Sequence, residues 1–133
     1  MNELNLKIPS ISDNIRIVES FIDNAKDKFN INDDLYGNIM IAVTESVNNA
    51  IAHGNNNDAK KSVDLKLTLS EKDLKVTVKD EGNGFDFDNV PDPTSPENLE
   101  KENGRGVFLI NNLCDTVNFE DKGSKVELVF NID

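Results

Sequence analysis

The sequence predicts a two-layer α/β sandwich, in which helices cover one face of a mixed, mostly antiparallel β-sheet. Three observations support this fold class: a half-buried strand opens the chain, two amphipathic helices follow it, and alternating apolar residues mark four later strands. Helices with one apolar stripe cover the apolar face of such a sheet. The 133 residues suffice for one domain and are too few for two. We therefore expect a single domain over residues 1–133.

The first two elements are a strand and a helix. Apolar and polar residues alternate from Leu4 to Ile8, as in a half-buried strand, and Pro9 ends the run. Ser10 with Asp13 resembles a capping box and is expected to open the first helix. The apolar face of this helix is expected to comprise Ile15, Val18, Ile22, Ala25 and Phe29.

The second helix is predicted to begin after a cap at Asn30 or Asn32 and to end at Gly54, before a run of asparagines. Its buried stripe recurs every four positions, at Leu35, Ile39, Val43, Val47 and Ile51. Glu45 and Asn49 are also four apart and stack beside this stripe. A bound metal and phosphate would satisfy both side chains, but for this helix alone a solvated edge with a cap-forming asparagine near its end explains them better.

Two strand pairs follow the helices. The first is predicted over Val63–Leu69 and Leu74–Val78 with a turn at 70–73, and the second over residues 116–119 and 126–132 with a turn at 121–124. Asp80 continues the parity of Val76 and Val78, so its side chain is expected to point inward. Residues 85–103 show no period and contain three prolines. A loop of this length in a compact domain is usually functional or mobile.

The net charge of −11 and the pI near 4.4 argue against non-specific binding to nucleic acid or to an anionic membrane, since both need a basic face. The charge does not exclude ATP, because a few amides and a metal can bind phosphate on an acidic protein. The sequence shows no signal peptide and no apolar run that could span a membrane. Cys114 is the single cysteine and fits a reducing compartment, so a cytoplasmic location is expected.

Four of the seven glycines form two pairs that flank the long loop, Gly82 with Gly84 and Gly104 with Gly106. Either pair alone is typical of a tight turn. Together they indicate a ligand site, because the first pair lets a planar base lie against backbone and the second precedes a short helix, 107–113, whose free amides suit phosphate.

Asp80 and Asn49 add polar groups to this arrangement. Asp80 can accept a hydrogen bond from an amino group such as that of adenine, or it can form the turn before Gly82. Asn49 offers a neutral oxygen to Mg²⁺, which typically takes only one or two protein ligands when phosphates supply others.

These segments resemble the N, G1 and G2 boxes of the gyrase, Hsp90, histidine-kinase and MutL (GHKL, or Bergerat) ATP-binding fold. They are Glu-Ser-Val-Asn-Asn-Ala-Ile-Ala-His-Gly at 45–54, Asp-Glu-Gly-Asn-Gly-Phe at 80–85 and Gly-Arg-Gly at 104–106. The first segment is most similar to the anti-sigma-factor serine-protein kinases. The resemblance covers nearly the whole chain.

The resemblance implies a role for each matched residue. Glu45 would be the general base, Asn49 would hold Mg²⁺ and Asp80 would recognise the adenine amine. Residues 86–103 would form the ATP lid, and Ser124 stands where the family often has threonine near the adenine. The ATP-binding residues implied in this way are Asn49, Asp80, Gly82, Gly84, Gly104, Arg105, Gly106, Val107 and Ser124.

Three charged or titratable residues allow two interpretations each. Arg16 on the first helix can act at the γ-phosphate, but a solvated helix face explains it better. Arg105 can pair with phosphate or point to solvent. His53, the one histidine, is better explained by capping or packing than by catalysis.

The function implied by the resemblance is that of an ATP- and Mg²⁺-dependent serine kinase. Its substrate would be a STAS-type anti-sigma-factor antagonist, and its second partner would be a sigma factor. One alternative is a partner-switch module that binds nucleotide without transferring phosphate. A sensor histidine kinase catalytic domain is a weaker alternative, because the chain shows no helix pair bearing a phospho-acceptor histidine. The sequence does not decide between a monomer and a homodimer.

Overall fold

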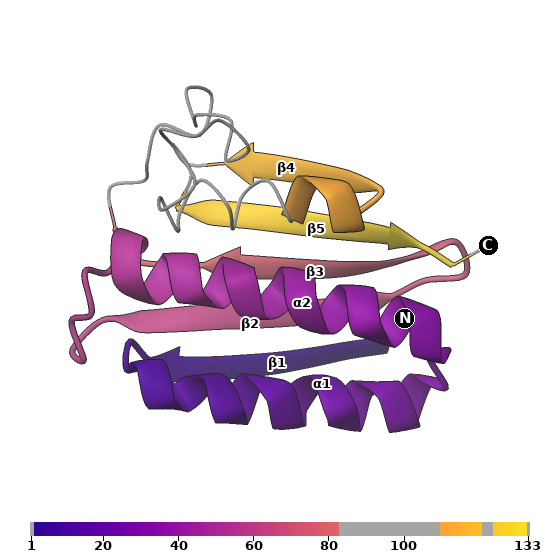
Figure 1. The fold of residues 1–133 in the computed structure, drawn as a ribbon, viewed down its shortest axis with the longest axis horizontal. Helices are drawn as coiled ribbons and strands as arrows, with labels where there is room; N and C mark the ends of the chain where they lie inside the picture. Colours follow the sequence, from indigo (N-terminus) through magenta and orange to yellow (C-terminus); the bar gives the residue numbers. More distant parts are fainter. Residues whose placement is uncertain (1, 83–109, 121–123, 133) are drawn as a thin grey trace, which may run out of the picture.

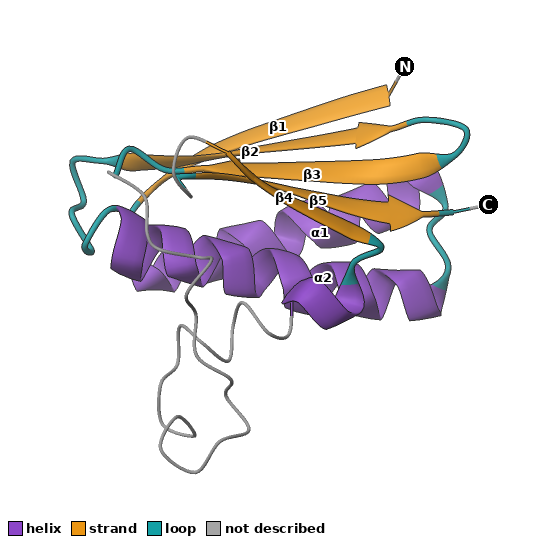
Figure 2. Cartoon of the chain, turned by 90° about the horizontal axis from the view of Figure 1, so that it is seen from above, coloured by secondary structure: helices purple, strands orange, loops and turns teal. Residues whose placement is uncertain are grey.

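The computed structural model describes residues 2–82, 110–120 and 124–132, which form two layers (Figures 1 and 2). Two long helices lie on one face of a five-stranded sheet, so the predicted sandwich is confirmed. The elements in chain order are β1 (Asn2–Pro9), the short 3₁₀ helix η1 (Ser12–Asn14), α1 (Ile15–Phe29), α2 (Asp33–Asn49), the π-helical turn η2 (Ala50–Gly54), β2 (Ser62–Leu69), β3 (Asp73–Lys79), β4 (Thr116–Glu120) and β5 (Lys125–Asn131).

The sheet has the strand order β1-β2-β3-β5-β4, and each neighbouring pair of these described strands is antiparallel. Both predicted strand pairs are present, with β2 joined to β3 and β4 joined to β5. In the sheet β5 lies between β3 and β4. Because β5 pairs with β3 in antiparallel orientation, the start of β5 lies next to the end of β3. Lys79 is opposite Lys125 in this register, so residue 80 and residue 124 lie together.

The hydrophobic core fills the space between the helices and the sheet. The predicted stripe of α2 is buried at Ile39, Val43 and Val47 and continues into η2 at Ile51. Alternate residues of the strands face this stripe. Removing such side chains from water contributes about 1.5–3 kcal/mol each. The core therefore fixes which residues of α2, β3 and β5 face one another.

The expected capping box at Ser10 is wrong. Ser10 is 1% exposed, and its hydroxyl donates to the Lys61 carbonyl at 2.8 Å and accepts from Asn55 Nδ2 at 2.7 Å. These long-range partners occupy the hydroxyl, and the chain passes through η1 before α1 begins at Ile15. The predicted cap of the second helix is confirmed at Asn32, because its Oδ1 accepts a hydrogen bond from the Leu35 amide at 2.8 Å.

The second helix ends in a widened turn. The Asn55 amide donates to the Ala50 carbonyl at 2.8 Å, and Asn56 and Asn57 then adopt left-handed backbone conformations with φ of 53° and 59°. Gly54 and the asparagines thus end the helix as predicted. Because a π-helical turn rotates the chain less per residue than an α-helix, it changes where Gly54 points.

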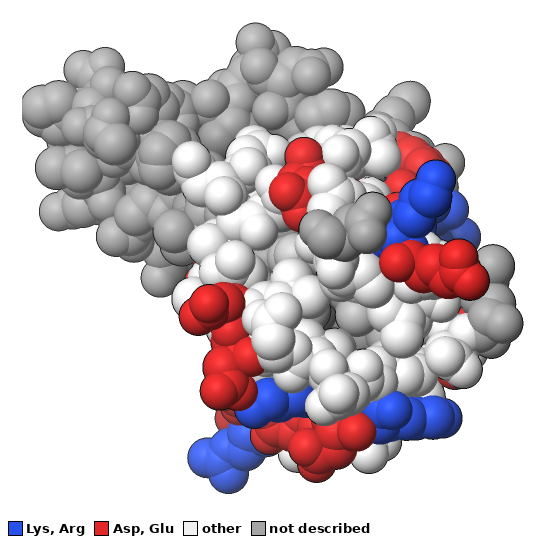
Figure 3. Space-filling view, turned by 90° about the vertical axis from the view of Figure 1, so that its right-hand side faces the viewer, with Lys and Arg blue, Asp and Glu red and all other residues white. Residues whose placement is uncertain are grey.

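The end of the molecule where α1 stops and α2 begins carries acidic and basic side chains side by side (Figure 3). Lys26 Nζ lies 2.8 Å from Asp33 Oδ1 at this end. Exposed pairs of this kind contribute at most about 1 kcal/mol. Among helices of the described residues, none combines the length and apolarity needed to cross a bilayer.

Cys114 follows the helical residues 110–113 and packs against the core, as its interpretation as a small apolar residue predicts. Burial raises the pKa of its thiol to about 12, and the neighbouring Asp115 carboxylate adds to this shift. The thiol is therefore protonated at neutral pH.

Candidate functional site

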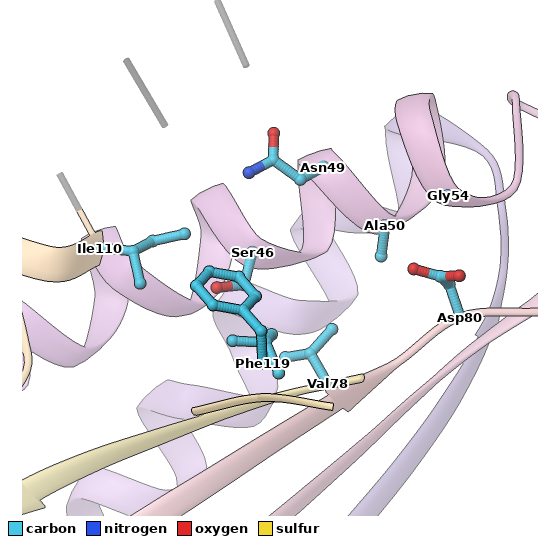
Figure 4. Close-up of a pocket in the computed structure, with 9 residues that line it drawn as sticks. Ser46, Asn49, Ala50, Gly54, Val78, Asp80, Ile110 and Phe119 are labelled. Atoms are coloured by element: carbon cyan, nitrogen blue, oxygen red, sulfur yellow. The ribbon is translucent and has the colours of Figure 1, made fainter. Parts of the chain in front are cut away.

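A pocket lies between the C-terminal half of α2 and the ends of strands β3, β4 and β5 (Figure 4). Its described lining is largely apolar, with polar groups from α2 and from the residue that follows β3. A mostly apolar cavity with a few placed polar groups is typical of small-molecule sites. The lining residues are Ser46, Asn49, Ala50, Gly54, Val78, Asp80, Ile110, Phe119 and Val126.

Asp80 is the buried acidic residue of this pocket and points inward, as its strand parity predicts. It is 8% exposed, and Figure 4 shows its carboxylate directed toward Ala50 and Gly54. The Gly82 amide donates to Oδ1 at 2.8 Å, which confirms the turn-forming interpretation. Oδ2 accepts no hydrogen bond from the described residues, so it can accept one from a ligand.

The environment of Asp80 disfavours its ionised form. Burial raises the pKa of the carboxyl above its ordinary value, while the Gly82 amide and the Lys61 charge act in the opposite direction. A ligand that donates a hydrogen bond to the carboxylate would favour ionisation.

Gly54 and Gly82 come close to Asp80 and to each other. A Cβ on Gly54 would lie 2.2 Å from Asp80 Oδ2, and a Cβ on Gly82 would lie 1.9 Å from the Gly54 carbonyl oxygen. Neither distance is compatible with a side chain. From the sequence, Gly54 was predicted to end the helix and to close the first matched motif, and nothing local in the sequence indicates that it packs against Asp80.

We expect Gly82→Ala to destabilise the protein by about 1–3 kcal/mol, because its methyl group would overlap the backbone of Gly54. The matched control is Gly37→Ala on α2, where an added Cβ meets no atom within 4 Å. That change should stabilise the helix by about 0.5–1 kcal/mol. Urea unfolding monitored by circular dichroism measures both. Equal stability of the two variants would contradict the close packing at Gly82.

Ser124 is buried beside Asp80. Its carbonyl accepts a hydrogen bond from the Asp80 amide at 2.8 Å, which ties the start of β5 to the end of β3. The sequence placed Ser124 near the nucleobase end only through the family resemblance. In the structure its backbone is hydrogen-bonded to that of Asp80, the residue expected to recognise the base, and Ser124 is not among the described lining residues of the pocket.

The two predicted residues of α2 differ in their relation to the pocket. Asn49 lines it and extends its amide away from Asp80 (Figure 4). Its side chain makes no hydrogen bond with the described residues. Glu45 is half-buried one helical turn earlier and is not among the described lining residues. Residues four apart share a helix face, so Glu45 extends the line from Asp80 through Asn49.

Several predicted site residues lie outside the described residues, namely the lid 86–103 and the positions Gly84, Gly104, Arg105, Gly106 and Val107. The predicted short helix is confirmed at residues 110–113, and its first described residue, Ile110, lines the pocket. Arg16 is exposed on α1, which agrees with a solvated helix face. His53 is exposed on η2.

Several residues that line the pocket were not predicted from the sequence. Val78 and Val126 could have been predicted, because both occupy inward-facing positions of their strands. Val78 lies at the end of β3 and Val126 at the start of β5, near Asp80. Ser46 lies on the buried side of α2, where its hydroxyl donates to the Ala42 carbonyl at 2.9 Å. Phe119 is brought in by β4, and only the strand order of the sheet could have placed it.

Comparisons with known proteins identify a matching family and several relatives. The profile of the histidine kinase-like ATPase domain family matches residues 8–130. An anti-sigma F factor of Oceanobacillus iheyensis is 30% identical, over 94% of this chain and 89% of that protein. A serine-protein kinase RsbW of Bacillus velezensis is 29% identical, over 86% of this chain and 75% of that protein.

A solved structure shows the same fold. It contains the RsbU and RsbW domains of Rv1364c from Mycobacterium tuberculosis and superposes with a TM-score of 0.71 at 15% sequence identity. The match covers 98% of this chain and 32% of that longer chain. At this identity the likeness concerns the fold alone.

Proposed function

The chain belongs to the histidine kinase-like ATPase domain family, and from this premise we propose that it is a serine-protein kinase that uses ATP to phosphorylate a STAS-type anti-sigma-factor antagonist. Relatives named as anti-sigma F factor and as serine-protein kinase RsbW match most of its length. The observation that carries the proposal is the pocket that brings together Asp80, Gly54 and Asn49.

The nucleobase end of the site is assigned to Asp80. Its Oδ2 would accept a hydrogen bond from the adenine amino group, and the apolar lining residues Ala50, Val78 and Ile110 would contact the ring. Guanine carries a carbonyl oxygen where adenine carries this amine. A carboxylate facing that oxygen gains no hydrogen bond, and both acceptors lose water. The site should therefore select adenine nucleotides.

The phosphate end is assigned to Asn49 and Glu45, which follow one another along α2 away from Asp80. Asn49 fits a magnesium site because its amide oxygen is neutral, lines the pocket and is not engaged by the described residues. When bound, Mg²⁺ neutralises charge on the phosphates. Glu45 lies about 6 Å farther along the helix axis, one turn from Asn49.

Glu45 is proposed to orient the attacking serine hydroxyl and to accept its proton. Phosphoryl transfer requires little covalent help from the protein, so catalysis depends on positioning the hydroxyl and the phosphate. A half-buried carboxylate on a rigid helix suits this role. The oxygen of the serine forms the new bond to phosphorus as the bond to ADP breaks.

Two protein partners are proposed, the antagonist that carries the serine and a sigma factor. Unphosphorylated antagonist would bind this protein. Phosphorylation of the antagonist would release this protein, which would then bind the sigma factor. A homodimer stays one of the two oligomeric states that the sequence allows. The alternative is a module that binds nucleotide without transferring phosphate, and the labelling experiment below distinguishes it from a kinase.

The proposal is tested by incubating the chain with γ-³²P-ATP, Mg²⁺ and a STAS-type protein from the same genome. We expect an acid-stable label on that protein, since phosphoserine survives acid, and loss of the label when its acceptor serine is replaced by alanine. Nucleotide binding without any label would favour the partner-switch module. An acid-labile label would favour a histidine kinase.

A further inference from the structure

We propose that Asn55 is a positioning residue that fixes the turn at residues 80–82 and thereby sets the base selectivity of the pocket; this inference rests on the proposed function. Asn55 is 0% exposed and follows the last residue of η2. Its side chain connects three segments that are distant in sequence. A fully buried amide of this kind destabilises a protein unless its donors and acceptor all have partners.

All of the hydrogen-bonding groups of the Asn55 side chain are used. Nδ2 donates to Ser10 Oγ at 2.7 Å and to the Ser62 carbonyl at 3.0 Å. Oδ1 accepts from the Glu81 amide at 2.8 Å. The first two partners belong to the framework, at the end of β1 and the start of β2. The third belongs to the turn that holds Asp80.

The turn is held by three successive amides, each with a different acceptor. The Asp80 amide donates to the Ser124 carbonyl, the Glu81 amide to Asn55 Oδ1 and the Gly82 amide to Asp80 Oδ1. Of these acceptors, only Asn55 belongs to the helix side of the pocket. Its hydrogen bond therefore sets how far the turn stands from η2.

The backbone of Asn55 is also fixed. Its amide donates to the Ala50 carbonyl at 2.8 Å, and its carbonyl accepts from the Asp58 amide at 3.0 Å. Gly54, the preceding residue, is the one whose carbonyl oxygen approaches Gly82. Asn55 thus holds both sides of the Gly54–Gly82 contact, against which the Asp80 carboxylate lies.

The consequence is selectivity for adenine as well as stability. Asp80 Oδ2 can distinguish an amine from a carbonyl only if its position relative to the base is fixed. If the Glu81 amide lost its acceptor, the turn would move or rotate to regain a hydrogen bond with water. Both purine nucleotides would then bind with more nearly equal affinity, because displacements of about 1 Å are enough to weaken such recognition.

The test compares Asn55→Ala with the neighbouring control Asn56→Gly in the full chain. Asn56 is exposed and left-handed, a conformation that glycine adopts readily. Calorimetric titration gives the dissociation constants of ADP and GDP with Mg²⁺. We expect Asn55→Ala to lower the GDP-to-ADP ratio of these constants about tenfold and the control to keep it within about twofold.

A second readout follows the turn without nucleotide. Amide hydrogen exchange of Glu81, measured by NMR, should become about tenfold faster in Asn55→Ala. A folded Asn55→Ala protein with the wild-type nucleotide ratio and unchanged exchange at Glu81 would overturn the proposal. It would show that Asn55 contributes to stability alone.

If Asn55→Ala does not fold, Ser10→Ala takes its place. This change removes one anchor of Asn55 Nδ2 and leaves the Oδ1 hydrogen bond to Glu81. We expect about a threefold fall in the nucleotide ratio, and an unchanged ratio overturns the proposal. Wild-type protein that binds neither nucleotide would instead refute the proposed function, while the exchange at Glu81 would still decide whether Asn55 holds the turn.

Discussion

Replacing Glu45 with glutamine is expected to lower phosphoryl transfer by about 10²–10⁴-fold, the usual contribution of a general base. Binding of ADP should stay within about twofold of wild type, because Glu45 is not among the described residues that line the pocket. Glutamine keeps the size of the side chain and its place on the helix but cannot accept the serine proton. The loss should therefore appear in kcat.

The matched control for this change is Glu71→Gln. Glu71 is exposed in the turn between β2 and β3, at the end of the sheet opposite Asp80. Single-turnover transfer of ³²P to the STAS-type protein and calorimetry with ADP measure the two properties separately. Full transfer activity in Glu45→Gln would remove Glu45 from catalysis. A parallel loss of ADP affinity would indicate a role in binding.

Asp80→Asn is expected to weaken ADP binding by about 10–100-fold, corresponding to the loss of a hydrogen bond to a charged group. The Gly82 amide already donates to Oδ1. If the asparagine oxygen keeps this bond, its NH₂ group replaces Oδ2 and faces the adenine amine. Two donors then oppose each other, and the preference for adenine over guanine should disappear.

The same substitution should leave the free protein as stable as wild type or more stable at neutral pH. Burial raises the pKa of Asp80 in the folded state above its unfolded value. At pH values above both the folded-state and the unfolded-state pKa, the ionised carboxylate therefore lowers the free energy of unfolding. This loss is relieved as the pH falls through the raised pKa of the folded state. A neutral amide removes the cost without protonation.

Thermal unfolding at pH 7 and calorimetry with ADP and GDP check both parts of this prediction. Asp64→Asn is the control, since Asp64 is exposed on β2. A large loss of stability in Asp80→Asn would mean that the charge of Asp80 holds the fold. Wild-type ADP affinity and selectivity would mean that Asp80 does not contact the base.

The sequence predicted the parts of the fold and site that depend on local periodicity. The four-residue period of α2 placed Asn49 beside the buried stripe, and the two-residue period of β3 directed Asp80 inward. These placements hold because the backbone geometry of a helix or strand fixes which side chains share a face. Hydrophobic burial then selects the face.

The sequence could not predict contacts that depend on tertiary structure. Ser10 looked like a helix cap, but its hydroxyl is bound by Asn55 and by the Lys61 carbonyl. Asn55 looked like one of several helix-ending asparagines. The contact of Gly54 with Gly82 likewise follows from the packing of η2 against the end of β3, which no local pattern records.

We propose that a nucleotide binds where η2, the turn after β3 and the start of β5 meet. The most direct measurement is a titration of the ¹⁵N-labelled chain with ADP and Mg²⁺, followed by amide NMR. We predict saturable shifts that are largest at Gly54, Gly82 and Ser124 and negligible in the turn at residues 70–73. Absence of saturable shifts at millimolar ADP, or largest shifts in that distant turn, would contradict the claim.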